Sequence, residues 1–339
     1  MPLVTPNSSY EFKHLKITPL HPTFGAEVEG VNFEEEISDE VFQEILAASA
    51  IYGVCVFRNT GLDDRRHVEF SRKFGQLDDI KPYLQPGRKL RYEYLELFDA
   101  GNVDENGKLL TPDHPRFHYN KGNFLFHVDS SFNPRRSSHS LLRGVILPPP
   151  HTGGNTDFAD TRTAFADLPP SLQESLIQRD YVVAHSIHHS RKTADPTFFS
   201  DLDPTQFPMS KHKLIQLHQP SGRMNIYTAA HAHHIVGLPA AENEELMKTL
   251  MEHATQEKYR MSVKWENEGD LVVWDNTCVM HRSGEFKGGY VRDMRRTTVH
   301  DGSSSAWGMN KEGDRKPGFD IGSKGLTVTK SVTGEGVIV

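Results

Sequence analysis

The sequence is poor in cysteine: of its 339 residues, only Cys55 and Cys278 could form a disulfide. Both lie within apolar runs, YGVCVF and DNTCVMH, which favours buried, reduced thiols. The low count excludes the disulfide-dense folds of small secreted proteins, and a cytoplasmic location is the expectation.

The sequence also has no hydrophobic run of the roughly 18 residues that a membrane-spanning helix needs. The opening stretch MPLVTPNSSYEFK lacks the charged-then-apolar pattern of a secretory signal. No basic block stands out and the formal net charge is −7, so we expect neither a nucleic-acid nor a membrane partner. A composition with 36% hydrophobic and 24% charged residues is typical of a soluble protein with a sizeable core.

Histidine, in contrast, is abundant, with 19 residues. The stretch FLFHVDSSF (124–132) places His127 and Asp129 one residue apart in an apolar run that reads as a strand, so both side chains would point to one face. Burying a carboxylate without a partner is costly. The two residues are therefore either a surface pair on a half-buried strand or part of a metal site, and this stretch alone favours the surface pair.

Short strand-like segments separated by turn signals dominate the chain and predict a mainly β fold with flanking helices, an antiparallel barrel or sandwich. Strands are expected within 14–33 and at 53–58, 92–98, 124–132, 139–147, 153–160, 181–190, 213–219, 224–229, 259–265, 270–276 and 295–300. Helices are expected at 38–52, 63–75, 159–179 and 239–255. The segment 302–339 is expected to be a peripheral extension whose last residues could add an edge strand.

A metal site at His127 and Asp129 would need a third ligand. His281 follows the apolar strand in DLVVWDNTCVMHRSG, a position that fits the mouth of a barrel. Two histidines and one carboxylate that leave open positions are diagnostic of non-haem Fe(II) oxygen chemistry.

Other histidines compete for this role. His67 and Glu69 also form a His-x-acid triplet, but they lie in a polar helix, where a solvated surface is the expectation. Two further clusters lack a carboxylate in register, so surface or pocket-lining roles are favoured for His185, His188 and His189 and for His231, His233 and His234.

An Fe(II) site with three open positions needs a reductant, and 2-oxoglutarate is the common one. Its distal carboxylate calls for a guanidinium, which can hold a carboxylate through two hydrogen bonds. RDMRRTTV reads as a strand that places Arg292 and Arg296 on one face and Arg295 on the other. Without the upstream histidine, a solvated basic edge would explain these arginines equally well.

Together these motifs resemble the taurine/2,4-dichlorophenoxyacetate dioxygenase (TauD/TfdA) family of Fe(II)/2-oxoglutarate oxygenases, and within it the 2,4-dichlorophenoxyacetate branch. The resemblance covers about residues 14–301. The segments that carry it are GAEVEGVNF, YGVCVFR, HVEFSRKFG, HVDSSF, LPPPHTGGNTDFADTRTAF, HAHHIVGLP, GDLVVWDNTCVMHR and RDMRRTTV.

The resemblance implies a double-stranded β-helix (jelly roll) in which His127, Asp129 and His281 bind the iron. It further implies that Thr156 and Arg292 bind the distal carboxylate of 2-oxoglutarate. Arg296 matches the arginine that grips the anionic head group of the substrate in this family. The remaining candidates for the substrate pocket are Asn102, Asn123, Phe126, Tyr227 and His231, although for each of them packing is favoured over a role in specificity.

The implied activity is the oxidation of a C–H bond of a small organic acid, coupled to conversion of 2-oxoglutarate and O₂ into succinate and CO₂. Hydroxylation, cleavage, desaturation and ring closure are all compatible with it. The whole chain is expected to form a single oxygenase domain with a C-terminal extension from residue 302, and a homo-oligomer stays open. Two alternatives are a Zn(II) jelly-roll hydrolase or isomerase and a non-catalytic jelly roll that binds a metal or ligand.

Overall fold

The computed structural model describes residues 10–81 and 90–314. The helices are α1 (Asp39–Tyr52), α2 (Asp64–Phe74), α3 (Pro115–Asn120), α4 (Thr161–Ala166), α5 (Pro170–Arg179), α6 (Ile187–Ala194) and α7 (Ala240–Ala254), with short 3₁₀ turns at Lys121–Phe124, Pro204–Gln206 and Glu257–Tyr259. The strands are β1 (Lys16–Pro19), β2 (Ala26–Glu29), β3 (Val54–Phe57), β4 (Phe98–Asp99), β5 (Ser137–Ile146), β6 (Thr156–Asp160), β7 (Val182–His185), β8 (Ser210–Lys213), β9 (Ile215–His218), β10 (Arg223–Ile226), β11 (Ala232–Ile235), β12 (Arg260–Val263), β13 (Leu271–Asp275), β14 (Val279–Ser283) and β15 (Asp293–His300).

A seven-stranded sheet of order β1-β2-β3-β13-β5-β15-β4 forms the centre of the molecule. Its middle strands are buried on both faces, which explains why 53–58 and 270–276 are continuous apolar runs rather than alternating ones. On one face Cys55 and Val273 pack under α1 and α2, and on the other Val56 and Trp274 form the inner core.

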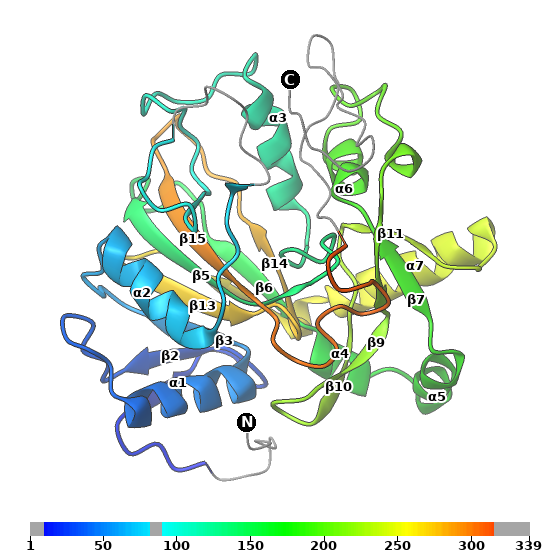
Figure 1. Ribbon diagram of the computed structural model, residues 1–339, viewed down its shortest axis with the longest axis horizontal. Helices are drawn as coiled ribbons and strands as arrows, with labels where there is room; N and C mark the ends of the chain where they lie inside the picture. Colours follow the sequence, from blue (N-terminus) through cyan, green and yellow to red (C-terminus); the bar gives the residue numbers. More distant parts are fainter. Residues whose placement is uncertain (1–9, 82–89, 315–339) are drawn as a thin grey trace.

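The inner core lies between the large sheet and the three-stranded sheet β12-β6-β14. Figure 1 shows α1 and α2 on the outer side of the large sheet, while α5 and α7 lie beside the smaller sheets. Two facing, mainly antiparallel sheets with helices outside are the architecture of a jelly roll, so the predicted fold class is confirmed.

The first two predicted helices have the ends that their sequences indicate. Ser38 caps α1 by accepting a hydrogen bond from the backbone of Val41, and Gly53 ends it in the left-handed conformation. Asp63 caps α2 in the same manner, and Gly75 follows its last residue.

Two predicted elements are wrong in their extent. The expected helix 159–179 consists of two helices, because Pro169 and Pro170 stop α4 and start α5. The expected strand 181–190 ends at His185, since Ser186 caps a new helix, α6, by accepting from the backbone of His189.

The expected strands at 92–98 and 124–132 are also largely wrong. The first is reduced to the two-residue β4, and the second is an isolated bridge at His127 followed by a turn in which Ser130 has φ 58°. A pair of backbone hydrogen bonds with His281, and one from the N–H of Ala230 to the carbonyl of Phe126, hold this segment in place.

One expectation about exposure is wrong. His67 is fully buried on the inner face of α2, where its ring contacts the carbonyl oxygen of Leu141 at 3.2 Å, and is not on a solvated surface. Most residues of the segment 302–314 are exposed, but the segment is bound to the rest of the chain, since Ala306 accepts from the backbone of Arg136 and Met309 donates to Lys211. The expected edge strand at the end of the chain lies outside the described residues.

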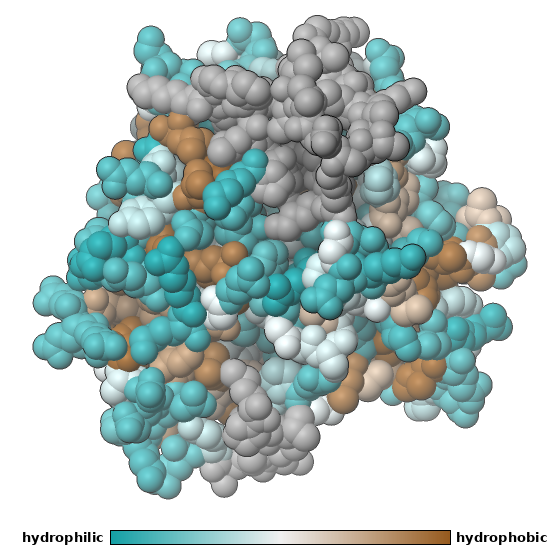
Figure 2. All heavy atoms as spheres, in the orientation of Figure 1, coloured by the Kyte–Doolittle hydropathy of each residue, from teal (hydrophilic) through white to brown (hydrophobic). Residues whose placement is uncertain are grey.

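Hydrophilic side chains predominate on the face shown in Figure 2, where hydrophobic ones form small separate groups. Among the described helices, none has the length and hydrophobicity to cross a bilayer. Cys55 and Cys278 are buried free thiols, as predicted.

Candidate active site

His127 and His281 lie side by side because their backbones pair directly. Each donates its N–H to the carbonyl oxygen of the other, at 2.9 and 2.8 Å, although 154 residues separate them in the sequence. Ligand atoms of His127, Asp129 and His281 all lie within 4.8 Å of one another, and all three residues are buried. The three predicted ligands therefore converge on one point inside the jelly roll.

The tautomer of His127 is fixed by its surroundings. Its Nδ1 lies 2.7 Å from the carbonyl oxygen of Leu125, which can only accept, so Nδ1 carries the proton and Nε2 presents a lone pair. Burial lowers the pKa of both His127 and His281, which keeps their imidazoles neutral. Neutral imidazole is the form that binds a metal.

The Asp129 carboxylate is ionised and held from two sides. Ser140 Oγ donates to Oδ2 at 2.7 Å, and Arg296 Nη1 donates to Oδ1 at 2.6 Å. Burial alone would raise the pKa of this carboxyl, but the positive charge of Arg296, with the hydrogen bond from Ser140, outweighs it and brings the pKa to about 2. Two neutral nitrogen donors and one anionic oxygen donor fit a divalent iron ion with open positions.

Arg292 is a buried guanidinium with a single side-chain hydrogen bond, from Nη2 to the carbonyl oxygen of Gly154 at 3.2 Å. Its Nε has no partner among the described residues, and burial lowers its pKa to about 10, so the group stays charged at neutral pH. The residue before this carbonyl, Gly153, must be a glycine. Its φ is 103°, and a Cβ added to it would lie 2.3 Å from Glu285 O.

Thr156 lies two residues after Gly154, at the start of β6, and is buried. Its Oγ1 accepts a hydrogen bond from Trp265 Nε1 at 3.1 Å. The contact between Arg292 and Gly154 therefore brings the two residues predicted to bind 2-oxoglutarate to one side of the barrel.

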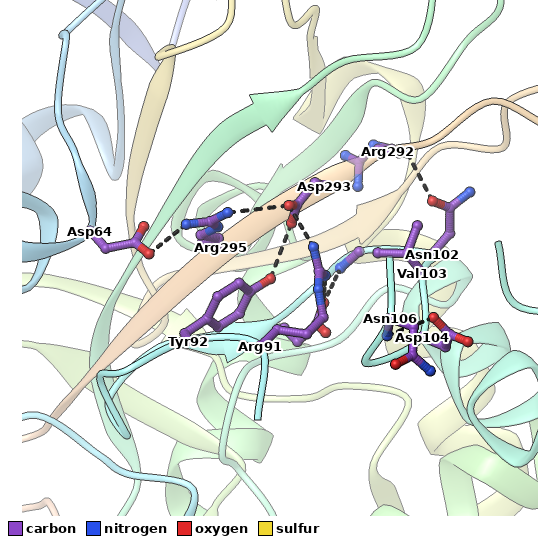
Figure 3. A network of polar contacts seen from close by, with 12 residues as sticks. Asp64, Arg91, Tyr92, Asn102, Val103, Asp104, Asn106, Arg292, Asp293 and Arg295 are labelled. Carbon is purple, nitrogen blue, oxygen red and sulfur yellow. Dashed lines mark hydrogen bonds and ion pairs between the residues drawn. The ribbon is translucent and has the colours of Figure 1, made fainter. Parts of the chain in front are cut away.

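The segment 91–104 is anchored to the start of β15 beside Arg292 (Figure 3). Asp293 accepts from Arg91 Nη2 at 2.6 Å, Tyr92 OH at 3.1 Å and Arg295 Nη2 at 3.3 Å. Both polar atoms of the Asn102 side chain are engaged, Oδ1 by the backbone N–H of Arg292 and Nδ2 by the carbonyl of Tyr290. Asn102, predicted as a residue of the substrate pocket, thus holds the backbone of Arg292 in place.

The remaining predicted pocket residues are distributed unevenly around the three ligands. The His231 ring lies edge-on to His127 at 5.7 Å, and its Nδ1 contacts Ser190 Oγ at 2.8 Å. Tyr227 and Phe126 are buried in one apolar cluster, whereas Asn123 is exposed on the 3₁₀ turn. Arg295 points to Asp64 on α2 while Arg296 points to Asp129, in accord with the predicted alternation.

A second buried group, His218, Asp275 and Cys278, also has ligand atoms within 4.8 Å of one another. His218 Nε2 already contacts Asp275 Oδ2 at 2.9 Å, and Asp275 Oδ1 accepts from the backbone and hydroxyl of Thr277. Burial raises the pKa of the Cys278 thiol, and the nearby guanidinium of Arg162 lowers it in part. This group is an internal hydrogen-bond network rather than an open metal site.

Two contributors to the site escaped the sequence-based predictions, the carbonyl of Leu125 and the hydroxyl of Ser140. A backbone carbonyl has no sequence signature. Ser140 is a small polar residue in the apolar run HSLLRGVIL, and this is the one signal that could have identified it.

Comparison with known proteins identifies the family of this chain. The sequence profile of the family described as "Taurine catabolism dioxygenase TauD, TfdA family" matches residues 16–298. The chain is 36% identical over 285 residues to the alpha-ketoglutarate-dependent 2,4-dichlorophenoxyacetate dioxygenase of Cupriavidus pinatubonensis, a match that covers 84% of this chain and 96% of the relative. It is 30% identical to the (S)-phenoxypropionate/alpha-ketoglutarate-dioxygenase of Sphingobium herbicidovorans, over 79% of this chain and 88% of that protein.

Among solved structures, the crystal structure of AAD-2 in complex with Mn(II) and N-oxalylglycine superposes with a TM-score of 0.77. The two sequences are 32% identical, and the match covers 84% of this chain and 97% of AAD-2.

Proposed function

The chain belongs to the TauD/TfdA family and is a dioxygenase that uses Fe(II), 2-oxoglutarate and O₂. On this basis we propose the class of its substrate and the residues that bind the iron, 2-oxoglutarate and the substrate. The substrate is a small carboxylate-bearing organic acid that is oxidised at a C–H bond. In this proposal His127, Asp129 and His281 hold the iron, and Arg292 and Thr156 hold the distal carboxylate of 2-oxoglutarate.

The observation that carries the proposal is the lone positive charge of Arg292. No carboxylate pairs with it among residues 10–81 and 90–314, whereas Arg295 pairs with Asp64 and Arg296 with Asp129. A buried charge is stable only with a partner, so Arg292 calls for an anion from outside the chain. A Zn(II) hydrolase or a storage protein has no need of such a clamp, and family membership likewise favours the dioxygenase.

The protein's own groups prepare the site before any chemistry takes place. Leu125 orients His127, and Arg296 and Ser140 keep Asp129 ionised and fixed. Burial of the three ligands excludes bulk water from the side of the barrel on which they lie. Fe(II) and 2-oxoglutarate, when bound, supply the activation of O₂ that accompanies decarboxylation to succinate and CO₂.

For the substrate we propose that Arg296 binds the carboxylate. Its guanidinium is partly exposed and touches Asp129, so an acid bound there has its chain close to the metal ligands. The names of both relatives describe aryloxy acids, phenoxyacetate and phenoxypropionate, which is consistent with a carboxylate handle. Phe126, Tyr227 and His231 would then line the pocket, and Asn123 and Asn102 would act at its margin.

The test is anaerobic addition of Fe(II) and 2-oxoglutarate to the metal-free protein. A weak visible charge-transfer band is expected, and a folded protein that shows no band would contradict the proposal. A panel of small carboxylic acids, including aryloxy acids, then identifies the substrate by succinate formation above the background without substrate. Amine analogues serve as controls for the anionic group, and they should not raise succinate formation.

A further inference from the structure

A buried chain of three polar side chains lies behind Asp129. Trp274 Nε1 donates to Asn276 Oδ1 at 2.9 Å, and Asn276 Nδ2 donates to Ser140 Oγ at 2.9 Å. Ser140 Oγ in turn donates to Asp129 Oδ2 at 2.7 Å. All three side chains are fully buried, and Ser140 lies directly opposite Trp274 in the pairing of β5 with β13.

The direction of each bond in this chain is fixed by chemistry. The indole N–H of Trp274 can only donate, so the Asn276 atom that faces it must be the carbonyl oxygen. The amide nitrogen of Asn276 then faces Ser140 and donates to it. The Ser140 hydroxyl therefore has its proton free to donate to Asp129.

Asn276 also holds the main chain of Asp129. Its Oδ1 accepts the backbone N–H of Asp129 at 3.2 Å, across 147 residues of sequence. One amide thus fixes Asp129 at two points, at the backbone directly and at the carboxylate through Ser140. The position and rotation of the carboxylate are both defined before a metal binds.

We propose that Asn276 is a positioning residue for the metal ligand Asp129 and acts through Ser140. The inference rests on the proposed function, in which Asp129 binds the iron. Side chains that orient a metal ligand typically contribute about 10- to 100-fold to metal affinity. The amide and the hydroxyl act in series, so removing either one breaks the same hydrogen-bond chain.

The test uses the full-length metal-free protein with Mn(II) and Co(II) as probes. Ser140→Ala and Asn276→Ala are each expected to weaken Mn(II) binding about tenfold. The double variant should bind Mn(II) no more weakly than Asn276→Ala alone, because that change already removes both the direct bond to Asp129 and the support of Ser140. The Co(II) absorption spectrum should change in the same variants, which reports on the geometry of the ligands rather than on folding.

Ser71→Ala is the matched control. Ser71 is also a fully buried serine in contact with a strand of the large sheet, where its hydroxyl pairs with Thr297 at 2.6 Å without reaching Asp129. It should lose stability but keep the Mn(II) affinity and the Co(II) spectrum of the wild type.

Asn276→Asp keeps the shape of the side chain and serves if an alanine variant does not fold. It retains an acceptor for Trp274 and Asp129, but it replaces the donor to Ser140 by an acceptor that competes for the hydroxyl proton. Weaker Mn(II) binding is expected here too. The inference would be overturned if folded Asn276→Asp or Ser140→Ala protein kept the Mn(II) affinity of the wild type, or if the losses in the double variant were additive. A wild-type protein that binds no metal would overturn the proposed function instead.

Discussion

Arg292 and Arg295 lie three residues apart at the start of one strand, yet their surroundings differ completely. Arg295 has Asp64 and Asp293 as partners and stacks on Tyr92 at 4.5 Å, so its charge is compensated within the protein. Among the described residues, the Arg292 side chain has only the backbone carbonyl of Gly154 as a partner. A residue that is structurally satisfied and one that awaits a ligand can therefore be told apart by their partners rather than by residue type.

Arg292→Ala is expected to weaken 2-oxoglutarate binding about 10- to 150-fold, because a charged hydrogen-bonded contact contributes roughly 1.5–3 kcal/mol. Anaerobic titration with 2-oxoglutarate, followed by the charge-transfer band, measures this change. Fe(II) affinity should stay that of the wild type. Arg295→Ala, the matched control, should lower the free energy of unfolding while leaving 2-oxoglutarate affinity intact. If Arg295→Ala weakened 2-oxoglutarate binding and Arg292→Ala did not, Arg292 would not be the residue that binds 2-oxoglutarate.

Helices with strong local signals could be predicted from the sequence almost to the residue. Ser38 and Gly53 cap α1 through bonds within their own segment, so neighbouring sequence suffices to predict them. The strand expected at 124–132 could not be corrected in this way, because its only pairing is with His281, far along the chain. Periodicity predicts local conformation, whereas tertiary partners decide whether an apolar run becomes part of a ladder.

The helix–turn segment that leads into His127 is tied to α6 by one carboxylate. Asp195 Oδ2 lies 2.7 Å from both His118 Nδ1 and Lys121 Nζ. Burial acts to raise the pKa of Asp195, but these two partners outweigh it and bring the pKa to about 2. Since the folded pKa lies below the ordinary value of about 3.9, the stabilisation exists at neutral pH and is lost as pH falls towards about 2.

Asp195→Asn should therefore lower the free energy of unfolding by about 1–3 kcal/mol at neutral pH. Urea unfolding at a series of pH values should show the difference from wild type shrinking between about pH 4 and pH 2. Asp180→Asn is the control, because Asp180 pairs with Lys213 at an exposed position and should change stability by at most about 1 kcal/mol. A difference that does not vary with pH would mean that the charge of Asp195 is not what stabilises the segment.

The turn at Gly153 gives a second prediction at the scale of an element. Gly153→Ala should distort the turn that presents the Gly154 carbonyl to Arg292, because the new Cβ would lie 2.3 Å from Glu285 O. We expect a loss of about 1–3 kcal/mol in stability together with weaker 2-oxoglutarate binding. Gly107→Ala is matched to it, since Gly107 also has positive φ (79°) but no atom within 4 Å of the added Cβ. Equal effects of the two changes would show that backbone strain, and not the contact with Glu285, is responsible.

At the scale of the whole molecule, the motifs predicted the fold class and the three residues that the structure brings together, while the supporting residues needed the structure. His127, Asp129 and His281 have recognisable residue types and spacing. The roles of Ser140 and Asn276 depend on which strands lie next to each other, and no local pattern specifies that. The single-domain assignment and the homo-oligomer stay predictions.

Side-chain hydrogen bonds tie the segment 302–314 to the rest of the molecule. Asn310 Oδ1 accepts from the backbone of Lys211, and its Nδ2 lies within hydrogen-bond distance of the carbonyls of Pro134, Lys211 and Trp307. Asn310→Ala is expected to lower the free energy of unfolding by about 1–3 kcal/mol, measured by chemical denaturation. Asn106→Ala, at an exposed turn, should change it by no more than about 0.5 kcal/mol. A wild-type value for Asn310→Ala would mean that the segment adds nothing to stability.

The paired backbones of His127 and His281 have a consequence for the supply of metal. Two histidines that we propose as ligands come from distant parts of the chain and are joined by peptide hydrogen bonds, which hold them together independently of an ion. We therefore expect the polypeptide to mature first and to acquire its ion afterwards, from whatever pool of exchangeable iron surrounds it. Under iron limitation the cell would then hold a reserve of folded, inactive enzyme, and restoring iron would restore activity without new protein synthesis.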